Sequence, residues 1–403
     1  MAHEPSGLDW LRALADYNFS VRRCVPIGSH RARVESDGRT LEARRLPEGS
    51  ARRRWALTDF CAQRRFRRTQ RPLLTMYHDR WVPLGDGSVV MVVDDFPGAA
   101  LQPTPEDATA AARHLARLHR AMAGAGELPD FADLPARYGQ WPDRLRQGRD
   151  ALAAERLLTQ AAAKAAPFNL PQGPGARAPS REGGAPAPAE RGGDAPGAAE
   201  RGGGALGAAE RGGGALGAAE RGGGAPGVAE RGGGTPATAE WVVWLDRWLD
   251  LAERALERLE ASGVASRARE GARRRELAWN GMRLQGLVRL GDGRIATLQP
   301  LDPVADLTLY DLATLCHDVC LAGHAAGVDD VMDAYGEAIR LDEDERAMVR
   351  AFAAFPHHAV SWLRLWRAGG AGLPADWTAT AQAHHRAATA LLGQGGDAHG
   401  DAC

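Results

Sequence analysis

Alternating apolar and polar residues mark two short hairpins in the first quarter of the chain. Residues 32–36 and 39–43 alternate on either side of Asp37 and Gly38, a pair that favours a tight hairpin turn. Residues 81–84 and 88–93 repeat this pattern around a Gly-Asp-Gly turn, whereas apolar residues between 51 and 68 have helical spacing. The block up to residue 97 is therefore predicted to be a small sheet with one helix.

Helical spacing dominates the rest of the chain. Thr104, Pro105 and Glu106 form a typical helix start, and apolar residues then recur on one face until Gly124. Further helices are predicted at residues 241–262, 309–323, 328–339, 343–354, 358–366 and 377–392. One more hairpin, at residues 286–298, lies among them.

A ten-residue repeat interrupts this helical block. Its Ala-Glu-Arg-Gly-Gly step recurs at Glu190, Glu200, Glu210, Glu220 and Glu230. Glycine triplets and prolines oppose helix formation, and the unit has no large side chain from which to build a core. We therefore expect a disordered insert. The predicted organisation is an N-terminal lobe at 1–97, a C-terminal lobe in two parts at 98–166 and 239–392, the insert at 167–238, and a disordered tail at 393–403.

Charge is distributed unevenly, although the formal net charge is only −1. Residues 21–75 contain fifteen arginines against five acidic residues, and the single lysine of the chain is Lys164. The arginines form either a solvated helix face or a surface that binds an anionic partner. We expect such a partner to be a protein. The residues concerned are Arg52, Arg53, Arg54, Arg64, Arg65, Arg67 and Arg68. Because no recognition motif accompanies them, specific nucleic-acid binding is not expected.

Neither a membrane span nor a secretory signal is predicted. No apolar run approaches the roughly 20 residues that cross a bilayer, and residues 1–10 are polar. The cysteines are few and scattered, at Cys24, Cys61, Cys316, Cys320 and Cys403. This usage favours reduced chemistry and a cytoplasmic location.

Several histidines, cysteines and tryptophans have spacings that invite a functional interpretation. Cys316, Cys320 and His324 follow one helix face, and we expect a core face there rather than a metal site. The adjacent pairs 357–358 and 384–385 are expected to be surface or rim histidines, since adjacent helix residues do not face each other. The tryptophans at 241, 244 and 248 are predicted to be a core stripe, with a partner groove as the alternative.

Five short motifs follow one another along the chain, at residues 94–98, 115–121, 138–142, 306–313 and 354–358. They read Asp-Asp-Phe-Pro-Gly, Leu-Ala-Arg-Leu-His-Arg-Ala, Tyr-Gly-Gln-Trp-Pro, Asp-Leu-Thr-Leu-Tyr-Asp-Leu-Ala and Ala-Phe-Pro-His-His. In this order they resemble the aminoglycoside-phosphotransferase and choline-kinase superfamily, and most closely its bacterial spore-coat protein S family. The resemblance implies an α+β, protein-kinase-like fold with a small antiparallel sheet lobe and a mainly helical lobe.

Catalysing members of this superfamily use a lysine on the third strand, a catalytic-loop aspartate, an asparagine five residues later and a metal-binding aspartate after the next hairpin. The family spacing places these positions on Arg44, Asn280, Gln285 and Gln299, with Ala278 at the preceding histidine. An amide cannot act as a useful base, and it offers Mg²⁺ only a neutral oxygen. No catalytic residue is therefore expected to be intact, and no metal or cofactor is expected.

The resemblance leaves two functions open. The first is a catalytically degenerate kinase-fold protein that binds a partner in spore-coat assembly, with Asp306 and Asp311 structural. The second is a small-molecule phosphotransferase with an atypical site for ATP and magnesium, in which Arg44 still pairs with phosphate and Asp302 or Asp306 supplies a relocated carboxylate.

Overall fold

The computed structural model describes residues 7–27, 30–165, 238–279, 281–298, 303–367, 373–374 and 376–393. It divides into one unit of residues 1–163 and 222–403 and a second unit of residues 164–221. Of the second unit only residues 164–165, at a helix end, are described. The predicted insert at 167–238 and tail at 393–403 lie outside the described residues, except for positions 238 and 393.

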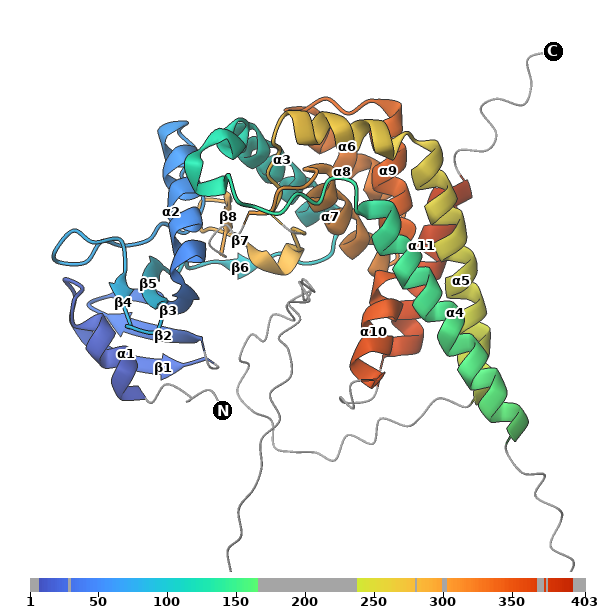
Figure 1. Ribbon diagram of the computed structural model, residues 1–403, viewed down its shortest axis with the longest axis horizontal. Coiled ribbons are helices and arrows are strands. Elements are labelled where there is room, and N and C mark those ends of the chain that lie inside the picture. The colour runs from blue at the N-terminus through green and yellow to red at the C-terminus, as the bar shows by residue number, and fades with distance from the viewer. Residues whose placement is uncertain are drawn as a thin grey trace, which may run out of the picture. The chain divides into compact units, whose positions relative to one another are not determined.

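A five-stranded antiparallel sheet with the order β1-β2-β3-β5-β4 forms the N-terminal part (Figure 1). Its strands are β1 (Val21–Pro26), β2 (Arg31–Ser36), β3 (Arg39–Pro47), β4 (Val82–Pro83) and β5 (Ser88–Asp94). Both predicted hairpins are confirmed, and Ser36 pairs with Arg39 across a turn in which Gly38 has φ 74°. The sequence pattern does not predict β1, an edge strand whose residues are largely exposed.

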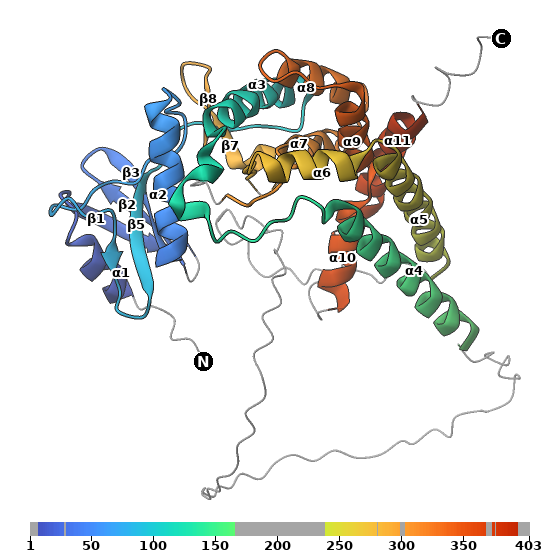
Figure 2. The same ribbon diagram turned by 45° about the horizontal axis from the view of Figure 1, so that its top comes forward.

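Two helices cover opposite faces of this sheet (Figure 2). Helix α1 (Gly7–Leu14) packs with the β3 residues Leu41 and Ala43. Helix α2 (Glu48–Gln63) lies on the other face with Met91 of β5. Successive strand residues point to opposite faces of a sheet. Glu42 and Arg44, which are two positions apart, therefore both project to the α2 side.

The C-terminal part is mainly helical, as predicted, and is built around α7 (Figure 1). Its helices are α3 (Pro105–Met122), α4 (Trp141–Ala165), α5 (Thr238–Ala261), α6 (Val264–Arg273), α7 (Leu309–Leu321), α8 (Gly327–Gly336), α9 (Glu343–Ala354), α10 (His357–Arg367) and α11 (Trp377–Gly393), with short 3₁₀ turns at Ala125–Glu127, Pro129–Phe131 and Leu284–Gly286. The predicted start of α3 is confirmed, since the Thr104 side chain accepts a hydrogen bond from the Asp107 N–H. Helix α7 is buried from Leu309 to Cys320 and packs against α3, α9 and α11.

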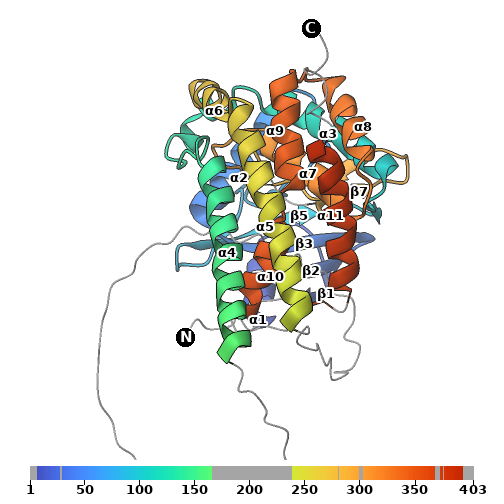
Figure 3. The ribbon, with the colours of Figure 1, turned by 90° about the vertical axis from the view of Figure 1, so that its right-hand side faces the viewer.

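The sequence-based prediction omits α1, α4 and α6. In α4 the fully buried residues Trp141, Leu145 and Leu152 are widely spaced among alanines and arginines, so the apolar stripe is narrow. Salt bridges from Arg146 to Glu260 and from Arg156 to Asp246 join α4 to α5 in antiparallel order (Figure 3).

A second, three-stranded sheet joins the two parts. It consists of β6 (Ala99–Ala100), β7 (Leu287–Arg289) and β8 (Ile295–Thr297), and its β7–β8 hairpin confirms the predicted one. The Thr297 N–H donates to the Arg68 carbonyl at 2.9 Å, which ties this hairpin to the segment after α2. A Cβ at Gly98 would lie 2.6 Å from the Arg289 carbonyl oxygen, so the connection requires glycine there.

Burial corrects part of the side-chain predictions. Trp241, Trp244 and Trp248 are buried, which confirms the core stripe, and Cys316 and Cys320 are buried as predicted. His324, however, is exposed and leaves that face. The surface assignment is wrong for His358 and His384, which are 8% and 0% exposed. The His358 ring packs against Trp248 and His317, and α11 packs onto α5, α7 and α9.

None of the helices within the described ranges is long and apolar enough to cross a membrane.

Candidate functional site

Asp311 holds the backbone of the loop at 278–285, which the sequence predicts to be the equivalent of the catalytic loop. Its carboxylate lies in the first turn of α7, is fully buried, and accepts hydrogen bonds from the N–H of Trp279 at 2.6 Å and of Gly281 at 2.8 Å. His119 Nε2 lies 3.0 Å from the same carboxylate, and His119 Nδ1 lies 2.8 Å from the hydroxyl of Tyr335. The carboxylate of Asp311 is therefore used by the loop backbone and the His119 ring.

A polar stripe along α7 continues this support. Thr314 Oγ1 donates to the Met282 carbonyl at 2.8 Å, and Asp318 accepts from the Leu284 N–H at 3.0 Å. Asp318 also pairs with Arg283 at 2.6 Å. Positions 311, 314 and 318 are spaced i, i+3, i+7, so they share one face of the helix. Sequence reasoning missed Thr314 and Asp318, although polar residues at this spacing on an otherwise apolar helix are a usable signal.

Asp306 lies in a buried environment beside this loop. Its Oδ1 accepts hydrogen bonds from the Leu307 N–H at 2.8 Å and from Trp141 Nε1 at 3.2 Å, which anchors the start of α4. Among the described residues its Oδ2 has no hydrogen-bond partner, although Arg144 Nη1 lies 3.7 Å away. Burial raises the pKa of Asp306 to about 7, while the Leu307 N–H and the Arg144 charge oppose the rise.

Arg44 projects from β3 to the junction of the two parts. Its Nη2 donates to Glu42 Oε2 at 2.8 Å, Gln70 Oε1 at 3.2 Å and the Leu298 carbonyl at 3.1 Å. Burial lowers the pKa of Arg44 to about 10, and the charge of Glu42 partly offsets this effect. Leu298 directly precedes Gln299 in the chain, the residue that the family spacing assigns to the metal-binding position.

The remaining predicted site residues are only partly described. Ala278 is fully buried, and its backbone pairs with Val304 through two hydrogen bonds of 2.9 Å, so its methyl group presents no donor in place of the family histidine. Gln285 is exposed in the 3₁₀ turn before β7. Asn280, Gln299 and Asp302 lie outside the described residues. The structure thus brings Arg44 to the end of the β7–β8 hairpin, where the Leu298 N–H donates to the carbonyl of Gly286, the residue after the loop at 278–285.

The basic segment of α2 and the residues after it divides into exposed and engaged arginines. Arg52, Arg64, Arg65 and Arg67 are exposed, whereas Arg53, Arg54 and Arg68 are half-buried. Arg64 donates to the carbonyls of Ala121 and Ala123 at the end of α3, and its guanidinium lies 4.0 Å from the Phe60 ring centroid. Part of the basic segment therefore stabilises the fold, and binding of an anionic partner stays a prediction.

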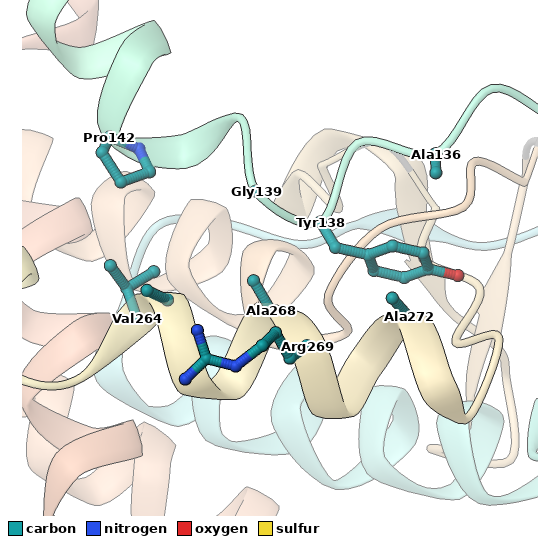
Figure 4. Close-up of a pocket in the computed structure, with 9 residues that line it drawn as sticks. Ala136, Tyr138, Gly139, Pro142, Val264, Ala268, Arg269 and Ala272 are labelled. Carbon is teal, nitrogen blue, oxygen red and sulfur yellow. The ribbon is translucent and has the colours of Figure 1, made fainter.

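A shallow hollow of about 360 Å³ lies between α6 and the segment 136–142 (Figure 4). Tyr138 and Pro142 face Val264, Ala268 and Arg269 across it. The Tyr138 hydroxyl donates to the Glu276 carbonyl at 2.8 Å, so it fastens the chain just before Ala278. The hollow is lined mainly by small apolar side chains and offers only the Arg269 guanidinium as a charged group.

Comparison with solved structures identifies the fold. An aminoglycoside phosphotransferase from Alicyclobacillus acidocaldarius superposes with a TM-score of 0.63 at 12% identity, over 95% of this chain and 94% of that one. Spectinomycin phosphotransferase is similar in its complex with ADP and spectinomycin, with a TM-score of 0.52 at 7% identity over 94% and 95% of the two chains. Its AMP-bound complex gives 0.51 at 8% identity, over 95% and 96%.

The predicted kinase-like fold is therefore confirmed: this chain has the fold of aminoglycoside phosphotransferases. No protein-family model matches the sequence, and no curated protein matches it. The closer resemblance to the spore-coat protein S family stays a prediction.

Proposed function

We propose that this chain is an ATP-dependent small-molecule phosphotransferase with an atypical phosphate site. The fold supports this, because the similar solved structures are phosphotransferases for aminoglycosides and spectinomycin. Only the sequence motifs support a role in spore-coat assembly. The same holds for a location on the spore coat. The substrate class that fits the proposal is a small molecule bearing hydroxyl groups.

The observation that carries the proposal is the position of Arg44. Its guanidinium reaches from the third strand to the carbonyl of Leu298, so a positive charge lies beside the residue that directly precedes Gln299 in the chain. A guanidinium matches the geometry of phosphate oxygens and can therefore replace the family's lysine. Phosphoryl transfer depends mainly on positioning and charge stabilisation, so a cation held at this junction is the group that the reaction needs most.

The carboxylates among the described residues do not form a magnesium site. Asp311 and Asp318 accept backbone hydrogen bonds, and Asp306 binds Trp141, so none of these three offers the open oxygen set that Mg²⁺ prefers. The proposal for that reason assigns no step of the reaction to a metal ion. Asp302, which lies outside the described residues, is the carboxylate that the proposal puts to the test.

The second candidate is a binding protein that has lost phosphotransfer. It is favoured by the residues themselves, since Ala278, Asn280, Gln285 and Gln299 leave these four family positions without an ionisable group. Such a protein would bind a nucleotide or small molecule at Arg44 and would release no ADP.

Two measurements on the full chain separate the candidates: thermal melting with ATP, with and without MgCl₂, and ADP release with a panel of aminoglycosides and amino alcohols. A ligand at 100 times its Kd adds about 2.7 kcal/mol of stability. The enzyme releases ADP only with an acceptor, and Arg44→Met and Asp302→Asn each reduce the rate at least tenfold. A binding protein shows an Arg44-dependent melting shift without ADP release.

Arg45→Met is the matched control. Arg45 is the next residue of β3, and its guanidinium pairs with Asp86 and Ser88 instead of the junction. Both candidates predict that this variant behaves as the wild type. Absence of both a melting shift and ADP release at millimolar ATP would refute both candidates and direct the search to protein partners.

A further inference from the structure

Three buried histidines meet in the interior of the helical part. His317 comes from α7, His358 from α10 and His384 from α11, and they are 3%, 8% and 0% exposed. One ring nitrogen of each lies within 4.8 Å of the others. The ring centroids are 4.6 Å apart for 358 and 384, 5.0 Å for 317 and 384, and 6.0 Å for 317 and 358.

A single backbone carbonyl orients two of these rings. The Ala353 oxygen, at the end of α9, lies 2.9 Å from His317 Nδ1 and 3.3 Å from His384 Nε2. A carbonyl only accepts, so both of these nitrogens carry the proton. The lone pairs are thereby left on Nε2 of His317 and on Nδ1 of His384. Metal-binding imidazoles are held in this way, with the second ring N–H donating to a carbonyl.

The third ring is held differently. Within the part of the chain that the structure describes, neither nitrogen of His358 has a hydrogen-bond partner, and His384 Nδ1 has none either. Buried polar atoms are nearly always paired, and an unpaired one indicates a missing water or ion. His358 is instead surrounded by aromatic rings, with Trp362 at 4.8 Å and Trp248 at 5.9 Å between centroids.

The surroundings favour neutral imidazoles, which are the form that binds metals. Burial lowers the pKa of His317 and His358 well below the usual range and that of His384 to about 4. The neighbouring titratable groups His357, His385 and Arg283 act in the same direction. Aromatic packing of three histidines would explain their burial, but it leaves the lone pairs of His358 and His384 without a function.

We propose that His317, His358 and His384 bind one divalent transition-metal ion, with Zn²⁺ the expected occupant. Three imidazole nitrogens suit zinc and similar ions, whereas Mg²⁺ and Ca²⁺ require oxygen ligands. Zinc–nitrogen bonds of about 2.0–2.1 Å need ligand atoms closer together than 4.8 Å, so metal binding would draw the three rings inward. Bound metal would join α7, α10 and α11, so the site has a structural role.

The test uses the full untagged chain, stripped with a chelator and then titrated with Co²⁺ and Zn²⁺. We expect one ion per chain by elemental analysis, a visible Co²⁺ absorption band, and quenching of tryptophan fluorescence by Co²⁺ because of the nearby Trp248 and Trp362. Zn²⁺ should raise the melting temperature. His358→Phe, which keeps a ring in the aromatic packing, should weaken binding at least tenfold.

His385→Phe serves as the matched control, because this half-buried neighbour of His384 packs on Trp244 and lies outside the trio. It should bind metal as the wild type does. Failure of the wild-type chain to bind Co²⁺ or Zn²⁺ would overturn the proposal, and this result does not depend on any variant folding. Unchanged affinity in His358→Phe would overturn it too, since the ion would then lie elsewhere.

Discussion

The buried carboxyl group of Asp306 makes the stability of this protein depend on pH in an unusual direction. Burial raises the pKa of Asp306 from its ordinary 3.8 to about 7 in the folded chain. Between pH 6 and pH 8 the folded state therefore releases a proton, while the unfolded state binds almost none. Stability from this group is present at low pH and is lost as the pH rises through 7.

The size of the effect follows from linkage. The proton occupancy of a group with a pKa of 7 falls from about nine-tenths at pH 6 to about one-tenth at pH 8. At about 1.4 kcal/mol per proton and pH unit, the free energy of unfolding falls by about 1.4 kcal/mol over this interval. Asp306→Asn has no titrating group there, and it keeps an oxygen for Trp141 and Leu307, so this part of the slope should disappear.

The assay is urea unfolding at pH 6, 7 and 8, followed by tryptophan fluorescence and compared between wild type and variant. The difference between the two free energies should change by about 1.4 kcal/mol across the series. Asp143→Asn is the control, because this acid lies on the same helix start as Trp141 but is exposed and pairs with Arg146. Arg144→Gln should move the wild-type decline to higher pH, since the Arg144 charge opposes the raised pKa.

Parallel profiles for wild type and Asp306→Asn would refute the reasoning. They would mean that the Arg144 guanidinium closes the 3.7 Å separation from the Asp306 carboxylate and keeps it ionised at every pH tested. A difference that grows in the opposite direction would refute it equally.

Three further predictions concern the buried polar groups and close backbone contacts. Asp311→Asn leaves one of two buried loop N–H groups without an acceptor and should cost about 3 kcal/mol in urea unfolding; a loss below about 1 kcal/mol contradicts this. Burial lowers the pKa of His114 to about 3, so the unfolded state binds more protons below pH 6.5. The wild type should therefore lose about 2 kcal/mol between pH 7 and 5 relative to His114→Gln, and equal profiles contradict this. Gly126→Ala puts a Cβ 2.0 Å from the Arg275 carbonyl oxygen and should lower the melting temperature, whereas Gly139→Ala, with open space around it, should not.

Local patterns account for what could be predicted of the fold. The hairpin at Asp37 and Gly38 and the helix start at Thr104 follow from turn and capping chemistry that involves only a few neighbouring residues. Strand β1 and helix α4 were not predicted from the sequence, because an exposed edge strand and a narrow apolar stripe carry little periodic signal. The family motifs then supplied the two-part fold, which periodicity alone does not specify.

For the candidate site, too, some features were visible in the sequence and others were not. The absence of ionisable groups at Ala278, Asn280, Gln285 and Gln299 is a property of the sequence and needs no coordinates. The support of the loop by Thr314 and Asp318 was missed, because a polar stripe on a helix does not reveal what faces it.

By itself, the sequence determined most of the hairpins and helices and the repeat segment, and it predicted that the family's catalytic positions are replaced. These depend on short-range spacing, which is visible in a linear chain. Only the tertiary structure decided that Arg44 reaches Leu298, and that His317, His358 and His384 share one buried space. Such contacts join residues tens to hundreds of positions apart, and their formation depends on how helices and strands pack, which hydrophobic periodicity does not encode.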